Sequence, residues 1–302
     1  KLYQTNSTTV QIIWETAMEG KIIDTSLKPK IEQNLAAFNK SRVCLLEEVT
    51  PVGMSSLKDL LDISLPDKSK QQKFVDLYFN HVGKMSEFWA NVEKNFGKDT
   101  ADQLQLDGKL GYLTANNAKL VSNLRNLVIK SPADLIEHGL YKNDAWRTIL
   151  TDAVSIPNDI PGGTPEEKRQ NYINNMVLLL KASYPTLVIA DMVKNDELKI
   201  AKVTDVDKND KIKIAEDANV KIKVIAFLKD NYDKFQIGIQ PLEKILKDNP
   251  KIKPDTKVLK ELKGLERIYQ ISPSDDAMKI LCTNNLDSAH AVVQYGEKEF
   301  IG

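Results

Sequence analysis

Residues 157–193 read PNDIPGGTPEEKRQNYINNMVLLLKASYPTLVIADMV, and this stretch decides the fold that the sequence predicts. A turn rich in proline and glycine leads to Thr164, whose hydroxyl suits the position before a helix, and Glu167 three residues later completes a capping box. Apolar residues then recur at helical spacing as far as Tyr184. Pro185 ends that helix, and a shorter apolar helix follows. The stretch therefore predicts a helical hairpin, and nothing in it carries out chemistry.

The composition is that of a globular chain. The 302 residues are 42% hydrophobic and 28% charged, which suits one large domain or two ordinary ones with a sizeable core. Since 42 basic residues balance 42 acidic ones, the net charge gives no reason to expect nucleic acid or an anionic membrane as a partner. No apolar run reaches about 18 residues, so we predict no direct membrane insertion by this segment.

The rest of the chain predicts further helices with clear boundaries. Ser131 and Ser272 each precede a proline and an acidic residue, as Thr164 does, and we expect their hydroxyls to cap helices. Gly108 and Gly111 resemble turn glycines between two helices. We predict an all-α fold, an irregular array of short to medium helices without a strict repeat.

The pattern changes at residues 196–224, where lysine alternates with isoleucine or valine. A period of two is typical of strands, so we predict a small β-hairpin near residues 197–216. The predicted organisation is a main helical body at 1–195, a hairpin-like insertion at 196–219, and a C-terminal helical part at 220–302 that packs on the body.

Both ends of the sequence look like cuts in a longer polypeptide. The first residues, KLYQTNSTTVQ, contain neither an initiator methionine nor the apolar region of a signal peptide. The last residues, Phe300 to Gly302, stop abruptly. We therefore expect one module of a longer parent chain, whose compartment the sequence does not reveal.

One stretch resembles a calcium-binding loop. Asp205, Asp207, Asn209 and Glu216 stand at positions 1, 3, 5 and 12 of an EF-hand-like pattern. Asp210 occupies the sixth position, where the sharp turn favours glycine. In a hairpin, extended geometry separates Glu216 from the turn, so the hairpin and the calcium loop exclude each other. We favour the hairpin and predict no metal site.

The remaining candidates for chemistry are few. Cys44 and Cys282 each sit among apolar neighbours, as small core residues do. Cys282 and His290 could form a dyad, although no family signature surrounds them. We predict no catalytic residues and no cofactor, and we interpret the lysines of residues 194–263, which alternate with acids and lack aromatic neighbours, as a solvated face.

Several stretches together resemble the large A subunits of Tc (toxin complex) proteins and their bacterial relatives. The resemblance rests on short helix-boundary motifs in the same order along most of the chain: residues 56–61 with Leu65-Pro66, residues 73–78, LGYLTANN at 110–117, residues 161–185, LKGLERIY at 262–269, PSDDAM at 273–278 and LDSA at 286–289.

This resemblance implies a non-catalytic module of the α-helical outer shell that encloses a pore-forming translocation channel. It also implies a pentameric assembly, contacts with other segments of a longer parent polypeptide, and a secreted or cell-surface location. Some relatives carry a neuraminidase-like label, but the sequence has no sialidase box and no propeller pattern. The alternative is a freestanding helical adaptor that binds a protein or peptide in an apolar groove. A hydrolase would need a pocket of converging titratable groups.

Overall fold

The computed structural model describes residues 16–21, 23–31, 57–200, 202–206, 212–272, 274–284, 286 and 288–293. For residues 57, 202–206, 212–216 and 292 it describes the backbone alone. Cys44, the ends of the chain, and the predicted hairpin turn at Asp207 and Asn209 lie outside the described residues.

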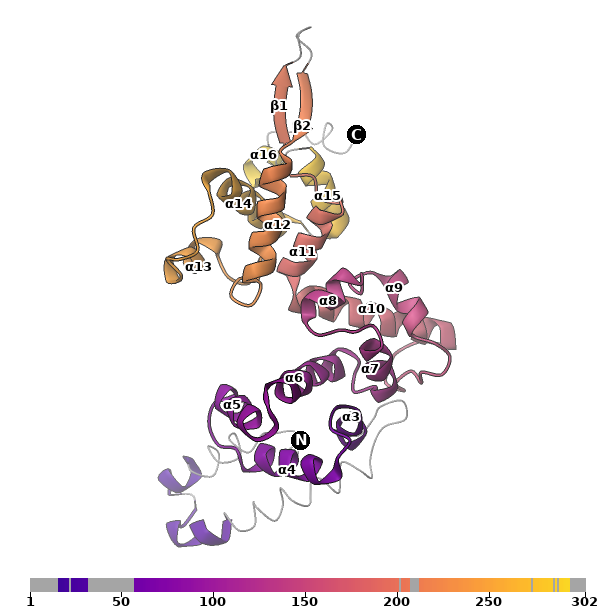
Figure 1. The fold of residues 1–302 in the computed structure, drawn as a ribbon, viewed down its shortest axis with the longest axis vertical. Helices are drawn as coiled ribbons and strands as arrows, with labels where there is room; N and C mark the ends of the chain where they lie inside the picture. Colours follow the sequence, from indigo (N-terminus) through magenta and orange to yellow (C-terminus); the bar gives the residue numbers. More distant parts are fainter. Residues whose placement is uncertain are drawn as a thin grey trace. The chain divides into compact units, whose positions relative to one another are not determined.

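In the described residues the fold is all-α, with one antiparallel pair of strands, as the sequence predicts (Figure 1). In chain order the elements are the 3-10 helix η2 (Thr25–Leu27), α3 (Leu57–Ser64), α4 (Lys68–Asn80), α5 (Met85–Phe96), α6 (Lys98–Leu113), α7 (Ala118–Arg125), α8 (Pro132–Glu137), α9 (Asn143–Ile149), α10 (Pro165–Ser183), α11 (Pro185–Lys194), β1 (Lys202–Val206), β2 (Ile212–Glu216), α12 (Ala218–Asn231), α13 (Leu242–Asp248), α14 (Thr256–Ile271), α15 (Asp275–Thr283) and α16 (Ala289–Val293).

The chain divides into two compact units. One comprises residues 1–131 and 143–176, and the other comprises residues 132–142 and 177–302. This division differs from the predicted body of residues 1–195, because α11 packs mainly against α12, which follows it, and against α8. The boundary falls inside α10, a place that no composition change marks.

Aromatic rings build the core of the first unit around α4 and α5. Phe74 lies edge-on to Phe88, with ring centroids 5.8 Å apart, and it also contacts Trp89 and Phe96. Leu61, Leu65, Val75, Val92, Ala101 and Leu104 complete this cluster. These residues come from the apolar faces of α3 to α6, which explains why four short helices form a stable group.

Helix α6 corrects one prediction, because Gly108 and Gly111 lie inside a continuous helix rather than in a turn. Leu110 is fully buried, so the helix gains more from packing than two glycines cost, about 1 kcal/mol each. A Cβ atom on Gly111 would come within 3.3 Å of Leu60 Cδ1. Glycine at this position therefore allows α3 to approach α6 closely.

A buried carboxylate joins three helices of the same unit. Asp107 on α6 is 4% exposed, and it accepts hydrogen bonds from Ser64 Oγ and from Gln103 Nε2 (3.0 Å). The guanidinium of Arg125 lies 3.8 Å from this carboxylate and also donates to the carbonyl of Ile63. The buried carboxylate of Asp107 thus has hydrogen-bond and ion-pair partners, and these contacts link α3, α6 and α7.

The predicted helix starts are partly confirmed. The N–H of Glu167 donates to Thr164 Oγ1 (3.2 Å), and Glu167 Oε2 accepts from the N–H of Thr164 (3.1 Å), which is the predicted capping box. The prediction for Ser272 is wrong, since its hydroxyl donates to the carbonyl of Ile268 at the end of α14 (2.6 Å). Ser274 caps α15 instead, accepting from the N–H of Ala277 (3.2 Å).

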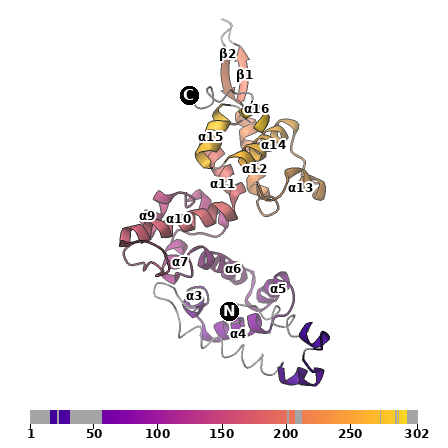
Figure 2. The same cartoon turned by 180° about the vertical axis from the view of Figure 1, so that it is seen from behind.

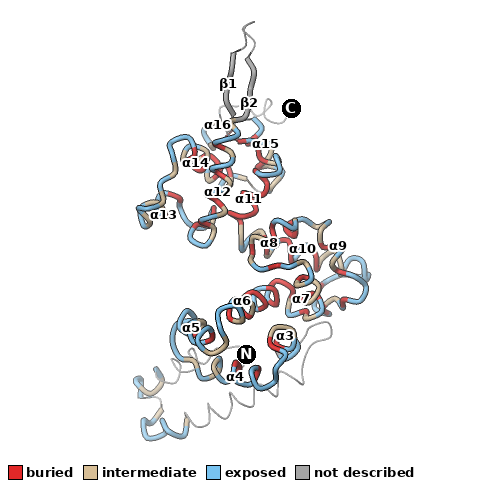
Figure 3. Tube along the Cα trace, in the orientation of Figure 1, coloured by how far each residue is buried: buried red, intermediate tan, exposed pale blue. Residues whose placement is uncertain are grey.

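Helix α11 is the centre of the second unit. Every residue from Pro185 to Val193 is buried, and Figure 3 shows the continuous buried run. Thr186 Oγ1 donates to the carbonyl of Phe235 (2.8 Å) and accepts from the N–H of Ile237 (2.8 Å). This hydroxyl therefore ties the start of α11 to the loop after α12, and Figure 2 shows the two helices from the opposite side.

The two strands confirm the predicted hairpin. Their register pairs Val206 with Ile212 at the turn and Lys202 with Glu216 at the base. The pair leads directly into α12, where Asp217 is the N-cap and accepts from the N–H of Val220 (3.2 Å).

A glycine in the second unit allows a close contact that we expect to be essential for packing. Gly238 has φ +80°, and a Cβ atom there would lie 2.3 Å from Cε1 of Tyr269. Gly238→Ala should therefore lower the free energy of unfolding by about 2–5 kcal/mol, from left-handed strain plus displacement of the ring.

Gly139→Ala is the matched control. Gly139 also has a positive φ of +71°, but apart from its chain neighbours no atom lies within 4 Å of the place that a Cβ atom would take. That variant should lose about 1–2 kcal/mol, from strain alone. Urea unfolding followed by circular dichroism measures both losses, and equal losses would show that the Tyr269 contact contributes nothing.

Candidate functional site

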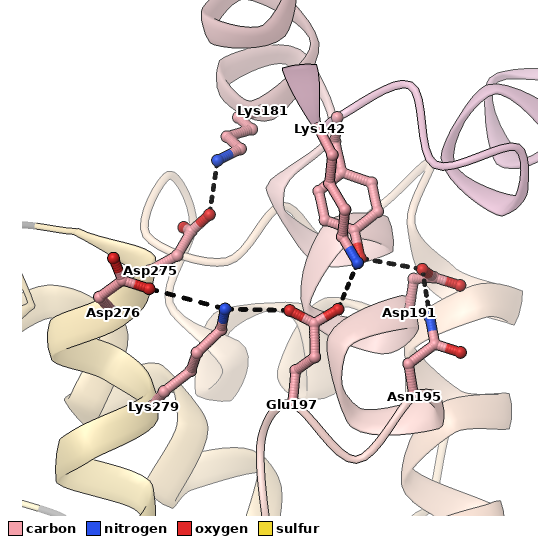
Figure 4. A network of polar contacts seen from close by, with 9 residues as sticks. Lys142, Lys181, Asp191, Asn195, Glu197, Asp275, Asp276 and Lys279 are labelled. Carbon is pink, nitrogen blue, oxygen red and sulfur yellow. Dashed lines mark hydrogen bonds and ion pairs between the residues drawn. The ribbon is translucent and has the colours of Figure 1, made fainter. Parts of the chain in front are cut away.

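The second unit contains a connected cluster of charged and polar side chains around Glu197, which we call the Glu197 cluster (Figure 4). Its members come from the turn after α8, from α11 and the residues that follow it, and from α15. They are Tyr141, Lys142, Asp191, Asn195, Glu197, Asp276 and Lys279. A separate ion pair, Lys181 with Asp275 (2.5 Å), joins α10 to α15 nearby.

The end of α11 places Glu197 in this cluster. Asp196 adopts a left-handed conformation (φ 61°), the N–H of Asp196 donates to the carbonyl of Val193, and the N–H of Glu197 donates to that of Met192 (2.8 Å). These two bonds form a Schellman motif, which reverses the chain at a helix C-terminus. The carboxylate of Glu197 consequently faces the elements beside α11 (Figure 4).

The turn after α8 places the other half of the cluster. Gly139 (φ +71°) ends α8, and the N–H of Lys142 donates to its carbonyl (2.9 Å). The hydroxyl of Tyr141 then donates to Asp191 Oδ2 (3.0 Å). Asn195 Nδ2 donates to the same oxygen (2.8 Å), so Asp191 shares its charge between two donors.

Burial makes this tyrosine–aspartate contact strong. Tyr141 is 1% exposed and Asp191 is 5% exposed. Burial, followed by the negative charge of Asp191, raises the pKa of Tyr141 well above its usual value. The tyrosine therefore stays protonated and serves as a fixed hydrogen-bond donor, because loss of its proton would leave two buried negative charges side by side.

Glu197 lies between two ammonium groups. It forms ion pairs with Lys142 and with Lys279, whose Nζ lies 3.0 Å from Oε2. Lys279 also lies 3.6 Å from Asp276, one turn earlier on α15. Partial burial opposes ionisation of Glu197, but hydrogen bonds from Lys142 and Lys279 outweigh it and lower the pKa of the carboxyl. The hydrogen bond to Glu197 raises the pKa of Lys279.

These contacts hold separate segments together. The cluster fixes residues 132–142, which come from before α9, against α11 and α15 of the same unit. Each carboxylate in it contacts at least one donor or cation of another residue. The hydroxyl of Tyr141 is covered and held as a donor, so it is not available as a nucleophile. The arrangement stabilises the unit.

The sequence did not single out these residues. The available signal was Asp191, a charged residue in the otherwise apolar run of α11. A charge within a helix that is buried on all sides requires partners. Which residues supply them depends on the tertiary arrangement.

The described part of the hairpin does not gather the calcium-loop candidates. Asp205 pairs with Lys213, and Glu216 pairs with Lys202 at the other end of the ribbon. Glu216 is thus three register positions from Asp205, about 10 Å along the strands. Asp207 and Asn209 are outside the described residues. Among the described residues, no group of three or more His, Cys, Asp or Glu side chains could hold a metal ion.

The cysteine and histidine candidates lie on two helices. Cys282 is buried in α15 (4% exposed), as predicted for a core residue, and His290 is exposed on α16. His138 is exposed after α8, and His81 follows α4, where its Nε2 lies 3.0 Å from the carbonyl oxygen of Lys84. A buried thiol differs from the accessible, electropositive setting that a reactive cysteine requires, so these positions do not support the dyad.

The first unit has a shallow groove of about 640 Å³ along one face of α4. Its lining is mostly polar, from Ser69, Gln72, Lys73, Asp76, Asn80, His81 and Asn91, with Leu77 and Val82 as apolar members. Such a lining differs from the apolar groove that a peptide-binding adaptor would use.

No single described helix has the length and hydropathy to span a bilayer. Helices α10 and α11 meet that test only as a pair, and the chain bends by 96° between them.

Removing the charge of Glu197 should destabilise the protein in a pH-dependent way. Because folding lowers the pKa of this carboxyl, the ionised form of Glu197 stabilises the folded protein. Its contribution to the free energy of unfolding is fully present above the usual glutamate pKa of about 4.3, and it is lost as the pH falls through the lower pKa of the folded state. Glu197→Gln should lower stability by about 1 kcal/mol at neutral pH, since both lysines are partly solvated. The difference from wild type should vanish at strongly acidic pH.

Thermal unfolding from neutral to acidic pH measures this effect. Asp230→Asn is the control, because Asp230 is an exposed acidic residue on α12 of the same unit. That variant should follow the wild-type profile. A Glu197→Gln profile parallel to wild type at every pH would contradict the assigned role.

The hairpin register also predicts the outcome of a calcium titration. Calcium needs six to eight oxygens at about 2.3–2.6 Å, which Asp205 and Glu216 cannot both supply from opposite ends of the ribbon. Calorimetry should therefore show no heat at millimolar calcium. Binding tighter than about 0.1 mM that Glu216→Gln abolishes would instead establish an EF-hand-like loop.

Comparison of the chain with models of known protein families, with characterised proteins and with solved structures gives no significant match.

Proposed function

We propose that the chain is a non-catalytic structural module, of the kind that forms the α-helical outer shell of a Tc-toxin A subunit around a pore-forming translocation channel. In this proposal its partners are other segments of a longer parent polypeptide and further copies of the same subunit in a pentamer. The location is the bacterial cell surface or the secreted fraction. The module has no active site of its own.

The observation that carries the proposal is that the buried carboxylates bind side chains of the same unit. Asp107 in the first unit and Asp191 in the second are the two buried carboxylates among the described residues, and both bind side chains from other parts of their own unit. In an enzyme, such groups would converge on a pocket with altered proton affinity. Here they join helix to helix, which supports a structural role.

The residues that carry the resemblance have structural roles of the same kind. The stretch 161–185 contains the capping box and the whole of α10. The stretch 262–269 lies in α14 and contributes the buried residues Leu262, Leu265 and Ile268. A shell module would keep such helix starts and core positions, because they determine its shape.

The adaptor alternative receives less support. A peptide-binding adaptor presents a continuous apolar groove, whereas the groove on α4 is mostly polar. The most exposed large apolar residues also lie on separate elements, for example Tyr112 on α6, Leu178 on α10 and Ile222 on α12.

The experiment that tests the proposal begins with the complete open reading frame. We expect downstream sequence that encodes a channel and the segment that binds the TcB component. Electron microscopy of the purified full-length product should then show a pentameric shell around a central channel. A reading frame that ends without such sequence, or a full-length product that stays monomeric without a channel, would contradict the proposal.

A further inference from the structure

The second unit exposes a set of lysines that its own acids do not neutralise. We call it the lysine patch, and it consists of Lys244, Lys247, Lys251, Lys253 and Lys260. None of these five forms an ion pair with a described carboxylate. Their neighbours do: Lys263 pairs with Glu243 (2.8 Å), Lys223 with Asp255 (2.8 Å) and Lys257 with Asp217 (3.3 Å).

The surrounding acids are therefore largely occupied. Of the acids in residues 242–260, all of which the structure describes, Glu243 and Asp255 are held by lysines outside the patch. Asp248 remains as the opposing exposed charge. A neutral chain thus carries a local excess of positive charge on α13, on the segment after it, and on α14. Figure 1 labels these two helices.

The backbone presents these lysines in a fixed manner. On α13, Leu242 and Ile245 are buried, so Lys244 and Lys247, three residues apart, share the opposite face. Between Pro250 and Pro254, the exposed Lys251 and Lys253 flank the half-buried Ile252, so both lysine side chains point outward. The two prolines restrict this segment. The Glu243–Lys263 pair holds α13 beside α14, which carries Lys260.

An exposed apolar side chain precedes the patch in the chain. Ile239 is 63% exposed and lies two residues before Pro241, the N-cap of α13. Its N–H donates to the carbonyl of Gln236 (3.0 Å), and the N–H of Gln240 donates to the same carbonyl (3.1 Å). A turn with two hydrogen bonds therefore presents Ile239 to solvent five residues before Lys244, the first lysine of the patch.

From this combination we propose that the lysine patch and Ile239 bind the surface of an anionic lipid membrane. Lysines near such a surface each contribute attraction to the anionic headgroups, and a neighbouring apolar side chain enters the boundary between headgroups and acyl chains.

Nucleic acid fits the patch less well. The patch consists of lysines and lacks arginine, whose planar guanidinium recognises phosphate through two hydrogen bonds. The tyrosines Tyr232 and Tyr269 are half-buried, so their rings are not available to stack on bases.

The binding is peripheral, and it is independent of the shell proposal. It requires no spanning helix, since the groups that contact lipid lie on the surface of a folded unit. Each lysine should contribute about fivefold to the partition coefficient at low ionic strength. Added salt should weaken the lysine contribution, while the contribution of Ile239 should persist.

Vesicle sedimentation with the whole chain tests the proposal. The chain should bind phosphatidylcholine vesicles that contain about one-third phosphatidylserine, and bind pure phosphatidylcholine vesicles much more weakly. The double variant Lys251→Gln/Lys253→Gln should reduce binding to the anionic vesicles about 25-fold. Ile239→Asn should weaken binding without changing the slope of affinity against salt concentration.

The matched control is Lys109→Gln/Lys119→Gln. Both lysines lie on the surface of the first unit, so this variant removes the same net charge outside the patch and should bind as wild type does. Circular dichroism should show that all variants remain folded. The proposal fails if the chain does not bind anionic vesicles, or if the control loses as much affinity as the patch variant. It also fails if the patch variant loses affinity for a single-stranded oligonucleotide but not for vesicles.

Discussion

The second unit depends on the complete burial of α11. A helix with nine consecutive buried residues cannot lie on a surface, so other elements must cover it on every side. Its cover comes from α8, which precedes it by about fifty residues, and from α12, which follows the hairpin. The discontinuous composition of this unit, residues 132–142 together with 177–302, follows from that requirement. One apolar segment of ten residues thus determines which parts of the chain belong together.

Complete burial also explains the polar contacts at both ends of α11. Thr186 and Asp191 are the polar side chains in its buried stretch, and an unpaired buried polar group costs about 1–3 kcal/mol. Thr186 obtains partners from the loop at 235–237, and Asp191 obtains them from Tyr141 and Asn195. Each polar group therefore fixes a covering element at one defined position. Hydrophobic burial supplies the stability of this arrangement, and these few hydrogen bonds make it specific.

Local features of the sequence were sufficient for part of this structure. Thr164 and Glu167 form the capping box that their spacing predicts, and the alternation of lysine with apolar residues predicts the strands, because these signals involve neighbours in the chain. Predictions failed where distant residues decide the outcome. Gly108 and Gly111 lie in a continuous helix because its apolar residues, such as Leu110, are buried in the core, and Gly111 lies close to Leu60 of α3. The Ser272 prediction failed for a local reason, since Ser272 belongs to the end of α14 and Ser274 caps α15. The Glu197 cluster joins residues as distant in the sequence as Lys142 and Lys279, and no spacing rule reveals such a cluster.

The balance of 42 basic and 42 acidic residues hides an uneven distribution of charge. In the Glu197 cluster, opposite charges meet across elements, so the field outside the protein is weak there. Around α13, Glu243 and Asp255 are paired with lysines outside the patch, so Asp248 is the one acid of residues 242–260 that opposes the five ammonium groups. Fields of exposed charges fall off within about 8–10 Å at physiological salt, so a surplus of this kind acts locally whatever the net charge is. Net charge is therefore a poor guide to anionic partners, because the pairing of charges on the surface determines which of them remain uncompensated.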